Sequence, residues 1–531
     1  MGNGTSKHNP KIQSFPIIRG TTCMNAYQLL REDPHAMLKD RADKSESILY
    51  EQMDEIFSIC ERFNLLVEEL YDFMKIFSEI TYNQKYDIED QSASQRKNEH
   101  LVTLPIDYFP TGHEKGYSIT LEFGGDHDRL TLFQFYGNRK SAMILGHDFI
   151  IPETNRKNDG SSLILFLAMQ IQLLLQKTIE LKLDLSIVRI PLIFVLGYSF
   201  DQTKFQAAII ENWFYNHNSK TLLGKNIIEL LQKELIEHNL NIEVHLCELL
   251  FINNHVYLKK NEVMPNLSIL VGENTYISYV IKKQTKIITQ MIKTKTKKAS
   301  MSSPEQSTTD SKKNLSIIQI LLHTYDCSTP DNNLESLWTK YDFQLHWNVT
   351  SQVSQTLDKL LNFSHVGESV RYILNDLKNR KILFPTRADH SQSYGKNILL
   401  LSLPNTFYNT YFSIIASDLT KEKQLTKQIL KNLGVWVSQD DCIIVQFVCR
   451  IVIQRIAKLL SAVVFCIIHK LQLEHSTIII GGHVYCSNVT FRHSFEFYLN
   501  LLVSSKYNYS LIRLNDCFTL GAAALALKYK Q

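Results

Sequence analysis

The ten residues LEFGGDHDRL, at positions 121–130, include types that can bind a phosphate group. Gly124 and Gly125 predict a tight turn after an apolar run. Backbone N–H groups at such a turn can approach an anion because no Cβ stands in the way. The carboxylates of Asp126 and Asp128 follow at once and would repel the same anion. The segment is therefore either a phosphate-binding loop or an ordinary hairpin turn, and its own residues favour the hairpin.

A second kind of chemistry is lipid attachment. The first residues, MGNGTSK, fit the N-myristoylation pattern, with Gly2 as the acceptor and Ser6 in the matching place. An unmodified, disordered start is the alternative and is slightly favoured. One acyl chain binds membranes only weakly, so the lysines of 282–298 would have to supply a second signal. We expect a cytoplasmic protein that is in part membrane-associated if Gly2 is acylated.

Size and charge limit the classes of function. With 531 residues the chain is too long for one compact core, and two or three domains are expected. Basic and acidic side chains are nearly balanced, at 57 and 53, which predicts no nucleic-acid partner. The nine cysteines are scattered without a C-x-x-C pair, so we expect reduced core thiols and no metal site.

Membrane spans and a secretory signal are not expected. The first fifteen residues are polar. The most apolar long stretch, 442–468, carries Gln446, Arg450, Gln454 and Lys458 at four-residue spacing. That spacing predicts a polar stripe on an amphipathic helix.

The elements that must position these residues are of mixed type. Apolar periodicity predicts helices over 45–80, 161–182, 225–238, 355–379, 421–432 and 442–468. Apolar runs and alternation predict strands over 117–123, 129–135, 190–197, 243–251 and 267–272. Strands interleaved with helices indicate an α/β architecture. Residues 1–15 and the Lys-rich, then polar, segment 282–313 are expected to be disordered.

Taken in order, several segments resemble fungal-type hexokinases over nearly the whole chain from about residue 45 to 530. They are PIDYFPTGHEKGYSITLEFGGDHDRL (105–130), LGYSFDQTK (196–204), FINNHVY (251–257), LSILVGENTYISYV (267–280), TKYD (339–342), VGESVRYILNDLKNRKILF (366–384), IIIGGHVY (478–485) and LGAAALALK (520–528). The resemblance implies an actin-like ATPase (ribonuclease H-like) fold, with two α/β domains closing over a cleft for sugar and ATP–Mg²⁺. It places the small domain at 101–252 with the C-terminal helix 515–531, and the large domain at 16–100 and 253–514.

The resemblance also implies a defect at the catalytic position. The family takes the proton of the sugar 6-hydroxyl with an Asp in an Asn-Asp turn, and here the turn reads Asn253-Asn254. An amide cannot accept that proton, and loss of a general base typically costs about 10²- to 10⁴-fold in rate. His255 is a candidate substitute base, although the interpretation that it fills a neighbouring family Thr position is favoured.

The implied nucleotide-binding positions are altered as well. They are Glu122, Gly124, Gly125, Asp126, Arg129, Gly272, Glu273, Gly482 and Gly521. Glu122 stands where the family has an Mg²⁺-linked Asp, and Asp126 and Glu273 replace hydroxyl residues of the phosphate loops. A carboxylate about 4 Å from a phosphate repels it by roughly 1 to 4 kcal/mol. In addition, the family's Gly-Ser-Gly before the last helix reads Cys517-Phe518-Thr519, which adds bulk.

The implied sugar-binding positions are Ser199, Asn253, Gln319 and Glu368. Other family contacts are lost, because Phe214-Tyr215 stand after Trp213 where the family has a Thr-Lys pair, and Leu321 replaces a Glu. Each polar group left unpaired costs roughly 1 to 3 kcal/mol.

We therefore expect a hexokinase-like pseudo-enzyme that regulates or scaffolds carbohydrate metabolism, with doubtful binding of hexose and ATP. The alternative is an active ATP:hexose 6-phosphotransferase with weak or altered activity. Recruitment of the fold to unrelated binding is a third, less favoured hypothesis.

Overall fold

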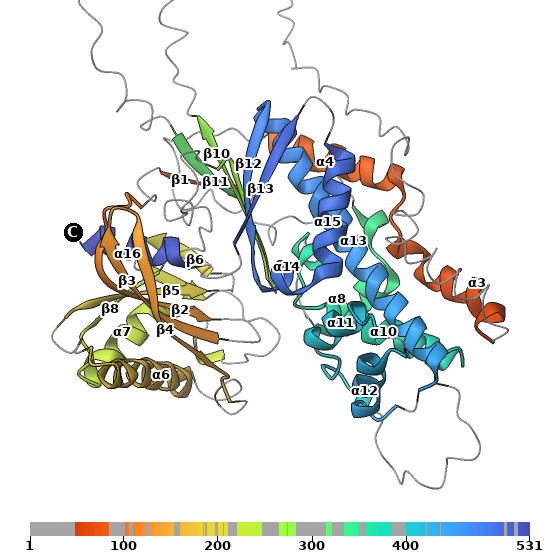
Figure 1. Ribbon diagram of the computed structural model, residues 1–531, viewed down its shortest axis with the longest axis horizontal. Helices are drawn as coiled ribbons and strands as arrows, with labels where there is room; N and C mark the ends of the chain where they lie inside the picture. The colour runs from red at the N-terminus through yellow and green to blue at the C-terminus, as the bar shows by residue number, and fades with distance from the viewer. Residues whose placement is uncertain are drawn as a thin grey trace, which may run out of the picture.

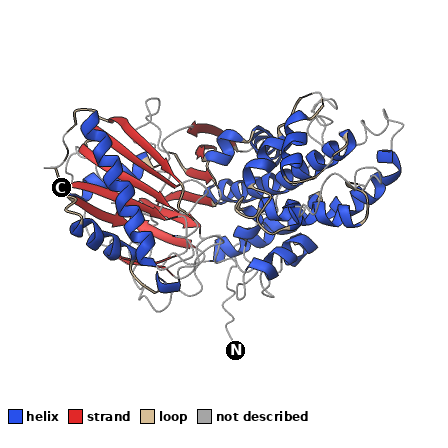
Figure 2. Ribbon diagram, turned by 90° about the horizontal axis from the view of Figure 1, so that it is seen from below, coloured by secondary structure: helices blue, strands red, loops and turns tan. Residues whose placement is uncertain are grey.

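The computed structural model describes 48–83, 101–105, 110–123, 128–152, 155, 160–183, 185, 188–196, 200–204, 207–210, 220–222, 224–246, 265–272, 274–282, 315–320, 334–349, 357–384, 400–420, 422–435, 437–503, 507–514 and 519–530. Gly2 and the segments expected to be disordered lie outside these ranges, apart from Lys282, which ends a strand. Two lobes are visible in Figure 1, and Figure 2 shows that most of the helices lie in one lobe, whereas the other is a sheet with a few helices packed on it.

The small domain is built on a five-stranded sheet of order β4-β3-β2-β5-β8. Its strands are β2 (Lys115–Phe123), β3 (Asp128–Gly137), β4 (Lys140–Phe149), β5 (Ile190–Leu196) and β8 (Ile242–Leu246). The first three are antiparallel neighbours, whereas β5 and β8 continue the sheet in parallel. A separate hairpin pairs β6 (Phe200–Lys204) with β7 (Ala207–Ile210).

Helices cover both faces of this sheet. One face packs on α6 (Gly160–Glu180) and α7 (Ile227–Glu237), with the short η4 (Lys220–Leu222) beside them. The other face packs on the C-terminal helix α16 (Leu520–Lys530), whose alanines lie against Phe133 and Ile193. Small side chains let this helix approach the strands closely.

The large domain contains a six-stranded sheet of order β1-β11-β10-β9-β12-β13. Its strands are β1 (Leu101–Pro105), β9 (Leu267–Val271), β10 (Thr275–Lys282), β11 (Leu315–Ile320), β12 (His475–Gly481) and β13 (Asn508–Leu514). The sequence places 101–105 at the start of the small domain, whereas in the structure β1 pairs antiparallel with β11 of this second sheet. Local composition could not reveal this, because the partner strand lies more than 200 residues away.

Both sheets share one topology. In each, a three-stranded antiparallel meander is followed by two parallel strands, which gives the spatial order third, second, first, fourth, fifth along the chain; β1 is an addition to the second sheet. The turn within 121–130 joins β2 to β3, which pair antiparallel up to Glu122 and Arg129. The hairpin interpretation is therefore right for the strands that flank the turn, and it does not exclude a phosphate-binding role.

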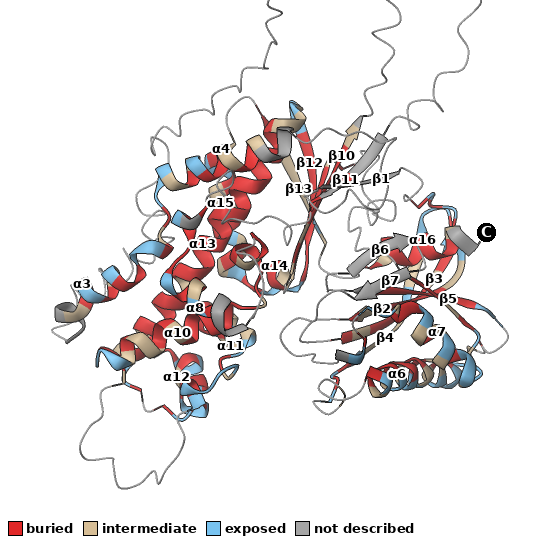
Figure 3. Cartoon of the chain, turned by 180° about the vertical axis from the view of Figure 1, so that it is seen from behind, coloured by how far each residue is buried: buried red, intermediate tan, exposed pale blue. Residues whose placement is uncertain are grey.

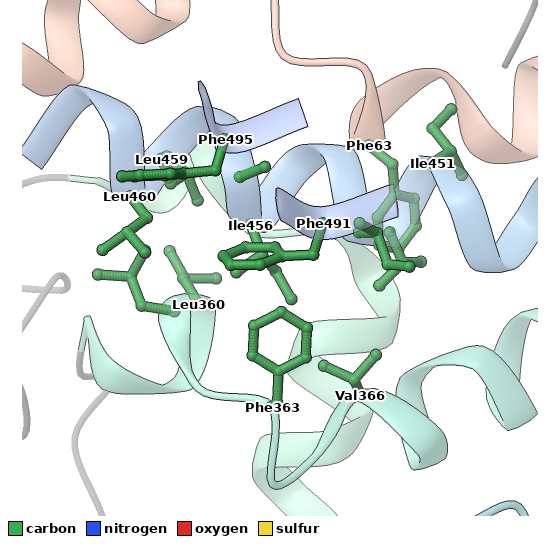
Figure 4. Packing of buried hydrophobic residues seen from close by; sticks show 14 of the residues in the cluster. Phe63, Leu360, Phe363, Val366, Ile451, Ile456, Leu459, Leu460, Phe491 and Phe495 are labelled. Carbon is green, nitrogen blue, oxygen red and sulfur yellow. The ribbon is translucent and has the colours of Figure 1, made fainter. Parts of the chain in front are cut away.

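The helices of the large domain form its main core. They are α3 (Ile48–Cys60), α4 (Val67–Asn83), α8 (Lys340–Val349), α9 (Asp358–Leu361), α10 (Val366–Asn379), α11 (Asn409–Ala416), α12 (Gln424–Asn432), α13 (Gln439–Leu471), α14 (His483–Ser487) and α15 (Val489–Leu502), with short turns η1 (Glu61–Phe63), η9 (Glu335–Leu337) and η11 (Leu400–Ser402). In Figure 4, Phe363 meets Phe491 edge to face, with ring centroids 5.0 Å apart. Figure 3 shows that α13 is buried along its length.

The polar side chains of α13 do not form a solvent-facing stripe, so that prediction is wrong. Gln446 is only 4% exposed, and its Nε2 donates to the carbonyl oxygens of Ile415 (2.9 Å) and Asp418 (2.7 Å). The Nε of Arg450 donates to the carbonyl of Ala416 at 2.9 Å. Ile415 and Ala416 are the last residues of α11 and Asp418 follows the helix, a place where carbonyl groups lack i+4 helical donors. The polar groups of α13 thus cap a neighbouring helix inside the domain.

Among the helices that the structure describes, α6 and α13 are long and apolar enough to span a membrane by length and composition alone. The most apolar window of α13 is entirely buried, and that of α6 is 39% buried. Buried core helices of globular domains meet the same criterion.

Candidate active site

Glu122 lies near the end of β2, on the face of the sheet that is covered by α16. Alternation along the strand sends Leu121 and Phe123 into the core against α6, and Thr120 and Glu122 to the opposite side. The predicted phosphate loop begins two residues later. The fold therefore brings this carboxylate to the edge of the sheet from which the loop departs.

The Glu122 carboxylate is bound by the segment that opens α16. The hydroxyl of Thr519 donates to Glu122 Oε1 at 3.1 Å, and the hydroxyls of Thr519 and Thr120 are 3.0 Å apart. Burial raises the pKa of the Glu122 carboxyl above its ordinary value, although the Thr519 hydrogen bond and the positive charge of Arg129 act in the opposite direction. The site thus favours the neutral form more than water does.

Arg129 faces another partner. It is the cross-strand neighbour of Glu122, and Asp148 is the next residue in the same row across the sheet. Its Nε lies 3.5 Å from Asp148 Oδ1, and a Cβ added to Gly146 would lie 2.8 Å from its Nη2. The guanidinium predicted to face a phosphate therefore leans over β4.

The second phosphate turn meets the β12–α14 connection in the large domain. Gly482 has a φ of +102°, and a Cβ added to it would lie 2.2 Å from the carbonyl oxygen of Val271. Gly272 lies under His483, whose Nδ1 would be 3.3 Å from an added Cβ. Any side chain at Gly482 would push the connection off the end of β9, so this glycine is required by the close approach.

Asn362 is hydrogen-bonded to the residues at the end of this turn, Asn274 and Thr275. Its Oδ1 accepts a hydrogen bond from the N–H of Thr275 at 2.8 Å, and its Nδ2 donates to Asn274 Oδ1 at 3.1 Å. The Thr275 hydroxyl donates to the carbonyl of Leu361 at 3.0 Å. The turn is thereby fixed to the segment between α9 and α10.

Glu368, predicted to contact sugar, is engaged within the protein. It is 6% exposed and accepts three hydrogen bonds of 2.8 to 3.0 Å from Arg371, together with one of 2.6 Å from the N–H of Asn405. The structure gives it a structural role, and sugar contact stays a prediction. Gln319 lies in β11 between Val102 and Ser278 of the neighbouring strands.

The remaining predicted positions divide into two groups. Gly521 lies in the first turn of α16, two residues after Thr519, and is buried. The others lie outside the described residues: Gly124, Gly125, Asp126, Ser199, Asn253, Asn254 and Glu273. Contacts of Thr519, Asn362 and His483 were not predicted. Of these three, only Thr519 could have been suspected from the sequence, because hydroxyl residues are common just before a helix.

The described residues do not fit a Mg²⁺ site. Magnesium prefers carboxylates that are ionised and free to bind it directly or through water. Here one oxygen of Glu122 already accepts the Thr519 hydrogen bond, and burial raises the pKa of the carboxyl above its ordinary value. Within the described ranges no group of three or more His, Cys, Asp or Glu side chains is placed to hold a metal.

Comparisons with known proteins agree with this architecture. Two family models described as Hexokinase match residues 55–250 and 277–528. The chain is 22% identical over 482 residues to "Hexokinase type 1" of Drosophila melanogaster, covering 90% of this chain and 94% of that protein. It is also 22% identical to "Hexokinase-3" of Mus musculus over 378 residues, 70% of this chain, but spans only 37% of that longer protein.

A solved structure gives the same result at the level of the fold. The hexokinase from Schistosoma mansoni complexed with glucose superposes with a TM-score of 0.70 at 19% identity, covering 90% of this chain and 98% of that one. The predicted actin-like ATPase fold is confirmed. The chain belongs to the hexokinase family.

Proposed function

We propose that this protein is a hexokinase-family member with impaired phosphoryl transfer that acts as a regulator or scaffold in carbohydrate metabolism. The observation that carries the proposal is Asn254, an amide at the position of the family's general base. Without a carboxylate there, the sugar hydroxyl keeps its proton as it attacks the phosphate.

Two contacts support the proposal. Glu122, at the position linked to Mg²⁺ in the family, is hydrogen-bonded to Thr519. Glu368, at a position of sugar contact in the family, has both oxygens engaged by Arg371. Carboxylates that already accept hydrogen bonds within the protein are poorly placed to bind a metal or a hexose hydroxyl.

One observation favours the alternative, an active ATP-dependent hexose kinase. The Gly482 connection still passes directly over Val271, which is the close backbone packing that a nucleotide cradle needs. Hexokinases use ATP and Mg²⁺, and the Schistosoma mansoni relative was solved with glucose. Glucose and ATP are therefore the substrates to test.

A coupled assay of purified protein with ATP, Mg²⁺ and either glucose or other hexoses tests the proposal. We expect a kcat far below about 10 s⁻¹, an ordinary value for an enzyme. A kcat of that size or greater would falsify impaired transfer. Asn254→Asp should raise any residual rate by supplying the missing base, whereas His255→Ala should leave it unchanged. Loss of the residual rate in His255→Ala would instead identify His255 as a substitute base.

A further inference from the structure

Thr519 joins two parts of the small domain that are far apart in the sequence. It precedes α16, is 1% exposed, and its carbonyl accepts the hydrogen bond from the N–H of Ala523 that begins the helix. Its side chain points to β2, where it meets Thr120 and Glu122. The resemblance places a glycine here, which would have no side chain to make these contacts.

Counting protons gives the direction of both hydrogen bonds when Glu122 is ionised. A carboxylate can only accept, so the single hydroxyl proton of Thr519 goes to Glu122 Oε1. The 3.0 Å contact between the two hydroxyls must then use the proton of Thr120, with Thr519 as acceptor. The chain Thr120 to Thr519 to Glu122 is therefore directional and ends on the carboxylate.

We infer that Thr519 is a positioning residue that holds Glu122 against the first turn of α16 and thereby weakens the Mg²⁺-dependent part of nucleotide binding. The inference rests on the proposed function, because it explains impaired transfer through one further residue. The hydroxyl engages one of the two carboxylate oxygens that would be open to a hydrated metal ion. Hydrogen bonds to charged groups are strong enough for this competition to change affinity by about tenfold or more.

Two substitutions separate the hydroxyl from the bulk of the side chain. Thr519→Val keeps the shape and removes the donor, whereas Thr519→Ser keeps the donor. Calorimetry with ATP in Mg²⁺, and again with ATP in EDTA, gives the factor by which Mg²⁺ improves the dissociation constant. We expect a factor near one for the wild type and for Thr519→Ser, and a factor about tenfold larger for Thr519→Val. In a Glu122→Gln background, Thr519→Val should have no effect, as a double-mutant cycle requires.

The inference is overturned by any of three results. In the first, the factor by which Mg²⁺ improves the dissociation constant is the same for Thr519→Val and Thr519→Ser. In the second, Thr519→Val changes ATP binding equally with and without Mg²⁺. In the third, folded Thr519→Val shows no increase in this factor, or no measurable ATP binding at all. Circular dichroism establishes that each variant is folded. Because the readout is metal-dependent binding rather than turnover, an active wild-type kinase would refute the proposed function and leave this measurement intact.

Discussion

Removal of the Arg371 guanidinium should destabilise the large domain strongly. Arg371 and Glu368 are 4% and 6% exposed, and the guanidinium donates to both carboxylate oxygens at 2.8 to 3.0 Å. It also donates to the carbonyl of Leu401 at 3.4 Å. Arg371→Met keeps an apolar stem of similar length but leaves a carboxylate buried without its counter-charge.

The magnitude follows from the burial. Breaking a buried ion pair by removing one partner typically costs about 3 to 5 kcal/mol, because the charge that remains is desolvated. The N–H of Asn405, at 2.6 Å, still donates to Glu368, so we expect the lower part of that range. With an unfolding slope of about 2 to 3 kcal/mol per M urea, the midpoint should fall by roughly 1 to 2 M.

The assay is urea unfolding followed by tryptophan fluorescence, to which Trp338 of the large-domain core contributes. The chain offers a matched control in Arg513→Met. Arg513 contacts both oxygens of Glu496 at 2.7 and 2.8 Å, but its side chain is 50% exposed. An exposed pair is worth at most about 1 kcal/mol, so this variant should unfold almost like the wild type. Equal midpoint shifts for the two variants would refute the argument from burial.

Two further predictions concern the large domain. Gly482→Ala should cost at least about 3 kcal/mol in the same urea experiment, because its φ is positive and its Cβ would meet the Val271 carbonyl at 2.2 Å. The control Gly224→Ala in the small domain, with a φ of +73° and open space around it, should cost only about 1 kcal/mol. Burial lowers the pKa of His365 to about 4, and the charge of Lys359 adds to the effect. As the pH falls, the unfolded chain therefore binds a proton at this histidine before the folded protein does. The free energy of unfolding should fall by on the order of 3 kcal/mol between about pH 6.5 and pH 4. His365→Asn should flatten this dependence in urea midpoints measured between pH 7.5 and 5, and an unchanged slope would contradict the assignment.

Much of the fold was predictable from local pattern. The alternation in 129–135 and the glycine pair before it predicted the hairpin of β2 and β3, and the apolar periodicity after residue 160 predicted α6. The strand β4 was missed, because its sequence KSAMILGHDF shows weak alternation and forms an edge that is only partly buried. Family membership was predictable from the order of the segments, although the chain is only 22% identical to the Drosophila melanogaster relative.

The candidate site was only partly predictable. The substitution at Asn254 can be seen in the sequence by itself, because it is a change of chemical type at one position. The partner of Glu122 could not be predicted, because Thr519 is 397 residues away and meets it only when α16 packs on the sheet.

The amino-acid sequence defines the properties of single residues and their spacing: which side chains can accept a proton, and which apolar periods form helices and strands. Tertiary structure alone decided which polar groups meet in the interior. The side chains of α13 that the sequence suggested for solvent cap α11 instead, and Glu368 binds Arg371. The physical reason is that a buried polar group must find a partner, and long-range packing selects that partner from residues distant in the chain.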